Sequence, residues 1–100
     1  MKNTLKKLLK GINGIKNIPE IPISGISTNS ALIKPGNLYI AIKGNRYDGN
    51  KFIPEAINNG ASAVITEYDY SNKLSTPIIK VTNSRKVVSR AAAEYYDHPT

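Results

Sequence analysis

The residues best suited to ligand chemistry lie in a glycine-bounded loop, Gly44 to Gly49, which follows an apolar run. Its centre, Asn45-Arg46-Tyr47, offers an amide, a guanidinium and an aromatic ring at consecutive positions. An arginine can donate paired hydrogen bonds to phosphate oxygens. This set suits a nucleotide base and diphosphate. An ordinary solvated connection between two elements explains the same residues equally well, because loops at strand ends are often only connections.

A catalytic group is harder to find in this sequence. His98 is the single histidine and precedes a proline, which favours a helix-end or surface role over that of a general base. No second soft metal ligand accompanies it, and the acidic residues form no paired-carboxylate motif. Neither Gly-x-x-x-x-Gly-Lys-Ser/Thr nor Gly-x-Gly-x-x-Gly occurs. We therefore predict no catalytic residue and no metal site in this chain.

Composition narrows the class of protein. The absence of cysteine excludes disulfides and thiolate metal sites and fits a reducing compartment. A net charge of +7 raises the question of a polyanionic partner, but the basic residues are scattered, without the interleaved aromatics that stack on bases. Residues 1–10 interleave leucines with lysines, unlike a signal peptide or membrane span. We expect a cytoplasmic protein with no nucleic-acid or membrane partner.

The hydrophobic pattern predicts alternating strands and helices. Helices are expected over residues 4–12 and 50–59 and from Asn83 or Ser84 to before His98, and strands over 18–27, 38–42, 61–66 and 77–81. The run 38–42 is apolar apart from a tyrosine hydroxyl, which predicts burial on both faces. Pro19 and Pro22 confine the weak strand 18–27 to a sheet edge. The strand, helix, strand unit over 38–66 should form a parallel, right-handed crossover.

These elements predict an α/β fold: a small three-layer open sheet, mostly parallel, with flanking helices. Residues 1–20 would form an amino-terminal helix and lead-in, and residues 21–100 the body of what is one structural domain overall. At 100 residues the chain has room for a single core.

Several segments, in this order, resemble the amino-terminal domain of the Mur ligases: Ile26 to Ser30, Lys34 to Gly44, Asp48-Gly49, Phe52 to Ile57 and Gly60 to Ile65. The resemblance extends from roughly Ile23 to the end of the chain. Two branches of the family share the pattern, one adding a diamino acid to UDP-N-acetylmuramoyl-L-alanyl-D-glutamate and the other adding D-alanyl-D-alanine. The ending Ala91 to Thr100, with its tyrosines and His-Pro-Thr, resembles the first branch.

The resemblance implies part of a three-domain, ATP-dependent ligase of peptidoglycan precursor synthesis. Its first domain binds the UDP end of UDP-N-acetylmuramoyl-L-alanyl-D-glutamate, and its central domain carries the phosphate loop that uses ATP and Mg²⁺. The present sequence lacks that loop. We therefore expect substrate binding without catalysis, no cofactor in this fragment, and the rest of its own chain as a partner. The added amino acid, meso-diaminopimelate or L-lysine, stays open.

The resemblance also implies which residues contact the substrate. Thr28 and Ser30 match positions that contact the uridine diphosphate, and Asn45, Arg46 and Tyr47 match a second contact segment. For Ser30, a turn-stabilising hydroxyl is the alternative interpretation, because serines commonly bond to nearby backbone.

One departure from the family concerns charge. The family usually has Asp-Ser-Arg where this chain has Asn29-Ser30-Ala31, so one negative and one positive charge are missing. We hypothesise that Arg46 or a nearby lysine supplies the positive charge. Two alternatives from other classes remain at this point: a stand-alone basic module for nucleotides or polyanions, and a purely structural interaction domain.

Overall fold

The computed structural model describes residues 4–9, 18–44, 48–68 and 76–96. Within these residues one sheet has the strand order β1-β2-β3-β4, with every neighbouring pair parallel. The strands are β1 (Gly25–Ser27), β2 (Asn37–Ile40), β3 (Ala63–Thr66) and β4 (Ile78–Lys80). Since all four run the same way, their carboxyl ends meet at one edge of the sheet. We call this the carboxyl edge.

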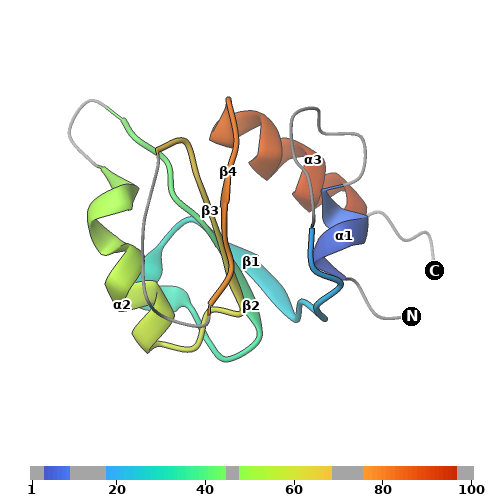
Figure 1. Ribbon diagram of the computed structural model, residues 1–100, viewed down its shortest axis with the longest axis horizontal. Helices are drawn as coiled ribbons and strands as arrows, with labels where there is room; N and C mark the ends of the chain where they lie inside the picture. The colour runs from blue at the N-terminus through green and yellow to red at the C-terminus, as the bar shows by residue number, and fades with distance from the viewer. Residues whose placement is uncertain (1–3, 10–17, 45–47, 69–75, 97–100) are drawn as a thin grey trace.

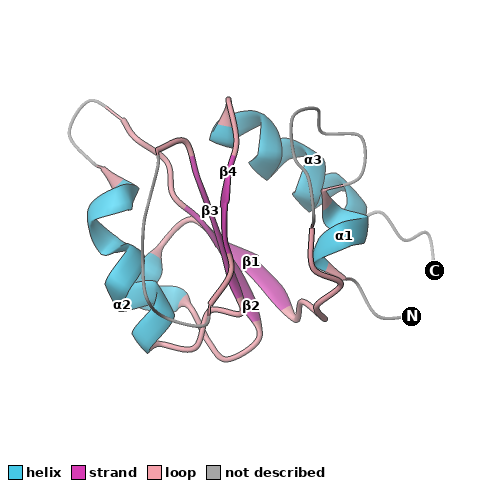
Figure 2. Cartoon of the chain, in the orientation of Figure 1, coloured by secondary structure: helices cyan, strands magenta, loops and turns pink. Residues whose placement is uncertain are grey.

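Helices cover both faces of the sheet (Figures 1 and 2). On one side lie α2 (Ile53–Asn58) and two short 3-10 helices, η1 (Ser30–Leu32) and η2 (Gly49–Phe52). On the other side lie α1 (Leu5–Leu8) and α3 (Ser84–Tyr96), which contact each other. The three-layer α/β prediction is therefore confirmed.

Each face of the sheet has its own hydrophobic core. Leu38 and Ile40 of β2 pack with α1 and α3, whereas Tyr39 and Ala41 pack with α2. All four side chains are at most 1% exposed. The two-residue alternation of a strand thus divides an unbroken apolar run between two cores, as predicted. Burying this run on both faces is what keeps the carboxyl edge in a fixed position.

The amino-terminal helix is shorter than predicted but deeply packed. Thr4 caps it, its hydroxyl accepting a hydrogen bond from the Lys7 backbone N–H at 3.2 Å. Leu5 and Leu8 have no exposed surface, so the helix belongs to the core that it shares with α3. The helix ends at Leu8 and not at residue 12; residues 10–17 lie outside the described part of the chain.

The strand predicted over residues 18–27 is also shorter in the structure. Only Gly25–Ser27 pair in the sheet, while Pro22 makes an isolated antiparallel bridge with Thr4. Pro19 and Pro22 have no N–H to donate to a ladder, which explains the loss of the first part of the strand. The predicted edge position is confirmed, since β1 is the first strand of the sheet.

Glycine and proline form the two tight turns that the sequence predicts. Pro35 and Gly36 occupy the centre of a turn closed by Asn37 N–H donating to the Lys34 carbonyl at 3.0 Å, and Gly36 has φ +92°. Gly60, with φ +108°, ends α2 as expected and accepts a hydrogen bond from Gly36 N–H at 3.1 Å. The two turns therefore support each other at the amino end of the sheet.

Two predicted helix starts are also confirmed. Pro54 lies in the first turn of α2, where its missing N–H costs little. Asn83 caps α3, because its side-chain oxygen accepts from the Lys86 N–H at 3.1 Å. The predicted helix over 50–59 is divided in the structure into η2 and α2. The remaining strands, β3 and β4, lie inside their predicted ranges.

Candidate functional site

The carboxyl edge gathers the polar loops of the molecule. Thr28 follows β1, Lys43 follows β2, Glu67 and Tyr68 follow β3, and Arg85 lies in the first turn of α3 after β4. In open α/β sheets, ligands bind at this end of the strands. The candidate site is therefore built from segments up to 57 positions apart in the sequence, between Thr28 and Arg85.

Two short backbone segments, one on each side of residues 45–47 in the sequence, are hydrogen-bonded to each other. Lys43 and Asp48 form an isolated antiparallel bridge, and Gly49 N–H donates to the Ile42 carbonyl at 2.8 Å. The buried Tyr39 hydroxyl donates to the Gly49 carbonyl at 2.8 Å. We call these paired residues, 42–43 with 48–49, the neck. It fixes both ends of the segment at the carboxyl edge.

Asn45, Arg46 and Tyr47 themselves lie outside the described residues, and their predicted contacts stay predictions. What the structure establishes is the position of the neck on either side of them.

A polar network ties the neck to β3. The Asp48 carboxylate accepts from Asn50 backbone N–H at 3.0 Å and from its side-chain amide at 2.8 Å. These hydrogen bonds hold the pKa of Asp48 below its usual value, because they stabilise the charged form. The buried Thr66 hydroxyl donates to the Asn50 side-chain oxygen and accepts from Tyr68 N–H. The neck is thus bonded to the end of a central strand.

Lys43 is a positively charged residue at the carboxyl edge. Its ammonium lies 5.8 Å from the centroid of the Tyr68 ring, within reach of a cation–π contact. Tyr68, and secondly Asp48, raise the pKa of Lys43 above its ordinary value. Lys43 therefore carries a full positive charge at neutral pH, within the neck.

A pocket of about 420 Å³ opens between the ends of β1 and β2 and helix α3, lined by Thr28, Ile42, Arg85 and Val88. Ile42 and Val88 provide apolar walls, whereas Thr28 and Arg85 bring a hydroxyl and a guanidinium. Arg85 Nη2 donates to the Lys43 carbonyl at 3.4 Å, a long bond that links α3 to the neck. The volume of the pocket and its mixture of apolar and polar walls are typical of small-molecule sites.

Ser30 points away from this pocket. Its side chain is 3% exposed, its hydroxyl donates to Glu55 Oε1 at 3.0 Å, and its carbonyl accepts from the Asn59 side chain at 2.9 Å. Ser30 therefore connects η1 to α2, whereas Thr28 lies on the α3 side. The structure brings Thr28 to the pocket and commits the Ser30 hydroxyl to a helix partner. Neither placement tests the predicted contact with a substrate.

Asn29 has a structural role at the position where the resemblance described above implies an aspartate. Its side-chain oxygen accepts from the Ala31 N–H at 3.0 Å and so caps η1. An amide oxygen performs this function without the negative charge. The missing carboxylate therefore leaves the turn intact.

The amino terminus of α3, the positive end of its helix dipole, already binds a carboxylate side chain. Glu67 Oε2 accepts from Ser84 N–H at 2.7 Å and from the Ser84 hydroxyl at 2.9 Å. A carboxylate at a helix amino terminus is stabilised by the helix dipole. Neither this pair nor Arg85 was predicted from the sequence. The predicted helix cap at Asn83 could have indicated the position of Ser84 and Arg85, because a helix that starts after the last strand begins at the carboxyl edge.

Two further observations concern the described residues alone. No group of three His, Cys, Asp or Glu side chains among them could hold a metal ion. No helix in this part of the chain has the length and hydropathy needed to cross a membrane. The residue considered for general-base chemistry, His98, lies outside the described residues.

Comparison with known sequences gives one family model, that of the Mur ligase family, catalytic domain, matched over residues 22–96. One relative, the UDP-N-acetylmuramoyl-L-alanyl-D-glutamate–2,6-diaminopimelate ligase of Caldanaerobacter subterraneus subsp. tengcongensis, is 40% identical over 97 residues, which are 96% of this chain and 20% of that protein. The enzyme of the same name from Aquifex aeolicus is 42% identical over 78 residues, covering 78% of this chain and 16% of that protein. The chain thus spans about a fifth of the length of such curated relatives.

Solved structures show the same fold. MurF from Acinetobacter baumannii superposes with a TM-score of 0.77 over 94% of this chain and 21% of that one, at 24% identity. The MurF ligase of Thermotoga maritima, solved in complex with ADP, gives a TM-score of 0.61 and 38% identity, covering 69% of this chain and 16% of that one.

Proposed function

We propose, since this chain belongs to the Mur ligase family, that it binds the UDP end of UDP-N-acetylmuramoyl-L-alanyl-D-glutamate within a peptidoglycan ligase that adds the third peptide residue. The ligand would lie at the carboxyl edge. Thr28, Asn45, Arg46 and Tyr47 would contact it, with Ser30 supporting the first loop or contacting the ligand directly.

The observation that carries this proposal is the pocket at the carboxyl edge. Thr28, expected to contact the uridine diphosphate, is one of its walls, and the neck that holds residues 45–47 is hydrogen-bonded to another wall, Arg85. Thr28 and the described residues on either side of positions 45–47 thus lie beside the same pocket, which supports the proposal. A base and a diphosphate need both the apolar and the charged walls.

The choice of branch rests on relatives. Several proteins 37–42% identical to this chain are named as diaminopimelate-adding ligases. Solved structures of similar fold include MurF proteins, and one from Acinetobacter baumannii is described as a D-alanyl-D-alanyl ligase. We propose the third-residue branch, with meso-diaminopimelate or L-lysine as the added amino acid. The D-alanyl-D-alanine-adding branch is the alternative.

We further propose that chemistry takes place elsewhere in a longer, cytoplasmic enzyme. ATP and Mg²⁺ would be held by a central domain, because this sequence contains no Gly-x-x-x-x-Gly-Lys-Ser/Thr loop and its residues do not fit that role. The chain itself would act as one binding domain, with residues 1–20 as lead-in and residues 21–100 as the substrate-binding body. Alone it would be inactive.

Titration calorimetry on this chain with UDP, CDP and ADP tests the binding function. We expect UDP to bind best and to retain most of its affinity between 50 and 200 mM salt. A polyanion-binding module would instead ignore the base and lose affinity steeply with salt, because binding would depend on counterion release. A structural interaction domain would bind none of the three nucleotides. Either result contradicts the proposal.

A further inference from the structure

Arg85 lies where a bound anion could reach its unused donors. It is exposed, it lines the same pocket as Thr28, and among the described residues its hydrogen bond is the long one to the Lys43 carbonyl. A guanidinium carries five N–H donors in a planar fork that matches two oxygens of a phosphate. One long bond leaves most of that capacity available.

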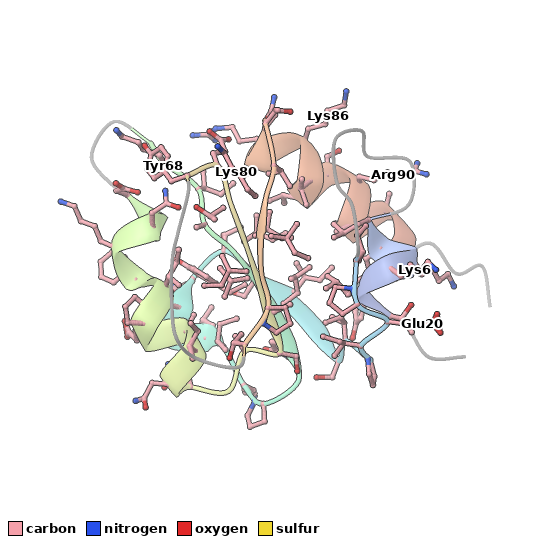
Figure 3. All side chains as sticks on the ribbon, viewed as in Figure 1. Lys6, Glu20, Tyr68, Lys80, Lys86 and Arg90 are labelled. Carbon is pink, nitrogen blue, oxygen red and sulfur yellow. The ribbon has the colours of Figure 1, made fainter. Side chains whose placement is uncertain are left out.

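Four other charged side chains near this edge are not among the residues that line the pocket. The Lys43 ammonium is placed over the Tyr68 ring, and the Asp48 carboxylate is bonded to Asn50. Glu67, the negative group next to α3, is bonded to Ser84. Lys86, the next residue on α3, points outward from the molecule (Figure 3). Arg85 is therefore the described cation best placed to meet a ligand in the pocket.

We propose that Arg85 binds the diphosphate of a uridine nucleotide, an assignment that rests on the proposed function. Thr28 donates its hydroxyl to the same group, while Ile42 and Val88 contact the apolar surface of the nucleoside. The pocket, at about 420 Å³, is far larger than an inorganic phosphate requires and suits a nucleoside diphosphate.

The test compares three ligands and three variants of this chain by calorimetry at fixed salt. Uridine, UMP and UDP separate the contribution of the nucleoside from that of the phosphates. Arg85→Gln removes the charge, Arg85→Lys keeps the charge without the fork, and Lys86→Gln removes a charge from the same helix turn outside the pocket. Circular dichroism and thermal unfolding check that each variant is folded.

We expect Arg85→Gln to weaken UDP binding roughly 10- to 100-fold, as loss of a charge-assisted hydrogen bond does, and to leave uridine binding nearly unchanged. Lys86→Gln should change UDP binding by less than about twofold, since an exposed charge is screened at physiological salt. Arg85→Lys should fall between wild type and Arg85→Gln, and this variant alone decides the matter if Arg85→Gln does not fold.

Three results would overturn the assignment. If wild type binds UDP and the Arg85 variants bind it equally well, the assignment of Arg85 fails while the proposed function stands. If uridine and UDP lose affinity equally in Arg85→Gln, the residue supports the pocket and does not bind phosphate. If wild type binds no uridine nucleotide, the proposed function fails and the assignment fails with it.

Discussion

Replacing Gly49 by alanine should destabilise the neck without touching any predicted ligand contact. A Cβ at residue 49 would lie 2.8 Å from the Ile42 nitrogen and 3.0 Å from both the Ile42 carbonyl oxygen and the Tyr39 hydroxyl. Two of these atoms are backbone and the third belongs to a fully buried side chain, so the neighbours cannot move away cheaply. Relief requires residues 48–49 to move away from Ile42 and Tyr39.

The cost has two parts. Overpacking a tight site typically costs about 1–3 kcal/mol. Separation would also weaken one of the 2.8 Å hydrogen bonds that Gly49 makes with Ile42 and Tyr39, each contributing about 1 kcal/mol. We expect a loss of about 2–4 kcal/mol, a large share of the roughly 5–15 kcal/mol typical of a domain.

Urea unfolding followed by circular dichroism measures this loss, and the midpoint should fall by at least about 1 M. Gly25→Ala is the matched control. Its Cβ would meet Asn37 Nδ2 at 2.8 Å; turning that side chain away weakens its exposed hydrogen bonds with Ser24 and Lys34 but moves no backbone, so the expected loss is about 1 kcal/mol. Equal midpoints for the two variants would show that Gly49 is not tightly packed against Ile42 and Tyr39.

Two other perturbations test the network at the carboxyl edge. Glu67→Ala should destabilise the chain by about 1–3 kcal/mol in thermal unfolding, because it leaves the buried Ser84 donors without their acceptor. The control, Glu20→Ala, removes an exposed carboxylate and should be near neutral in the same assay. Similar unfolding curves for the two variants would contradict the capping role of Glu67. The lowered pKa of Asp48 means that its stabilising contribution is complete above roughly pH 4 and is lost as the pH falls through the folded-state value, so Asp48→Asn should flatten that acid limb. Titration of the Asp48 carboxyl by NMR checks the direction, and a midpoint at or above that of an unfolded peptide would refute it.

The parts of the fold that follow from local pattern could be predicted from the sequence. The apolar run of β2, the Pro35-Gly36 turn, the Gly60 helix end and the Asn83 cap each depend on a few consecutive residues, and all four are confirmed. The lengths of α1 and β1 were wrong because pairing partners decide where an element ends. A proline such as Pro22 can be extended without belonging to a ladder.

The site was harder to predict because its contacts join distant parts of the chain. Ser30 bonds to Glu55, 25 positions away, and Lys43 bonds to Arg85, 42 positions away. Nothing in the spacing around Ser30 indicates that its hydroxyl turns toward α2. Arg85 likewise resembles one more basic residue on a helix until the parallel order of the strands places the start of α3 beside Thr28.

The neck has a consequence for how this domain could diversify. The backbones of Lys43 and Asp48 are paired. The three positions between Gly44 and Asp48 are therefore attached to the same two fixed ends, whichever residues stand there. Ligand preference could then change by exchanging side chains there, while the sheet, both cores and the folding energy stay as they are. The arrangement separates the evolution of recognition from that of stability, as the framework of an antibody does for its variable loops.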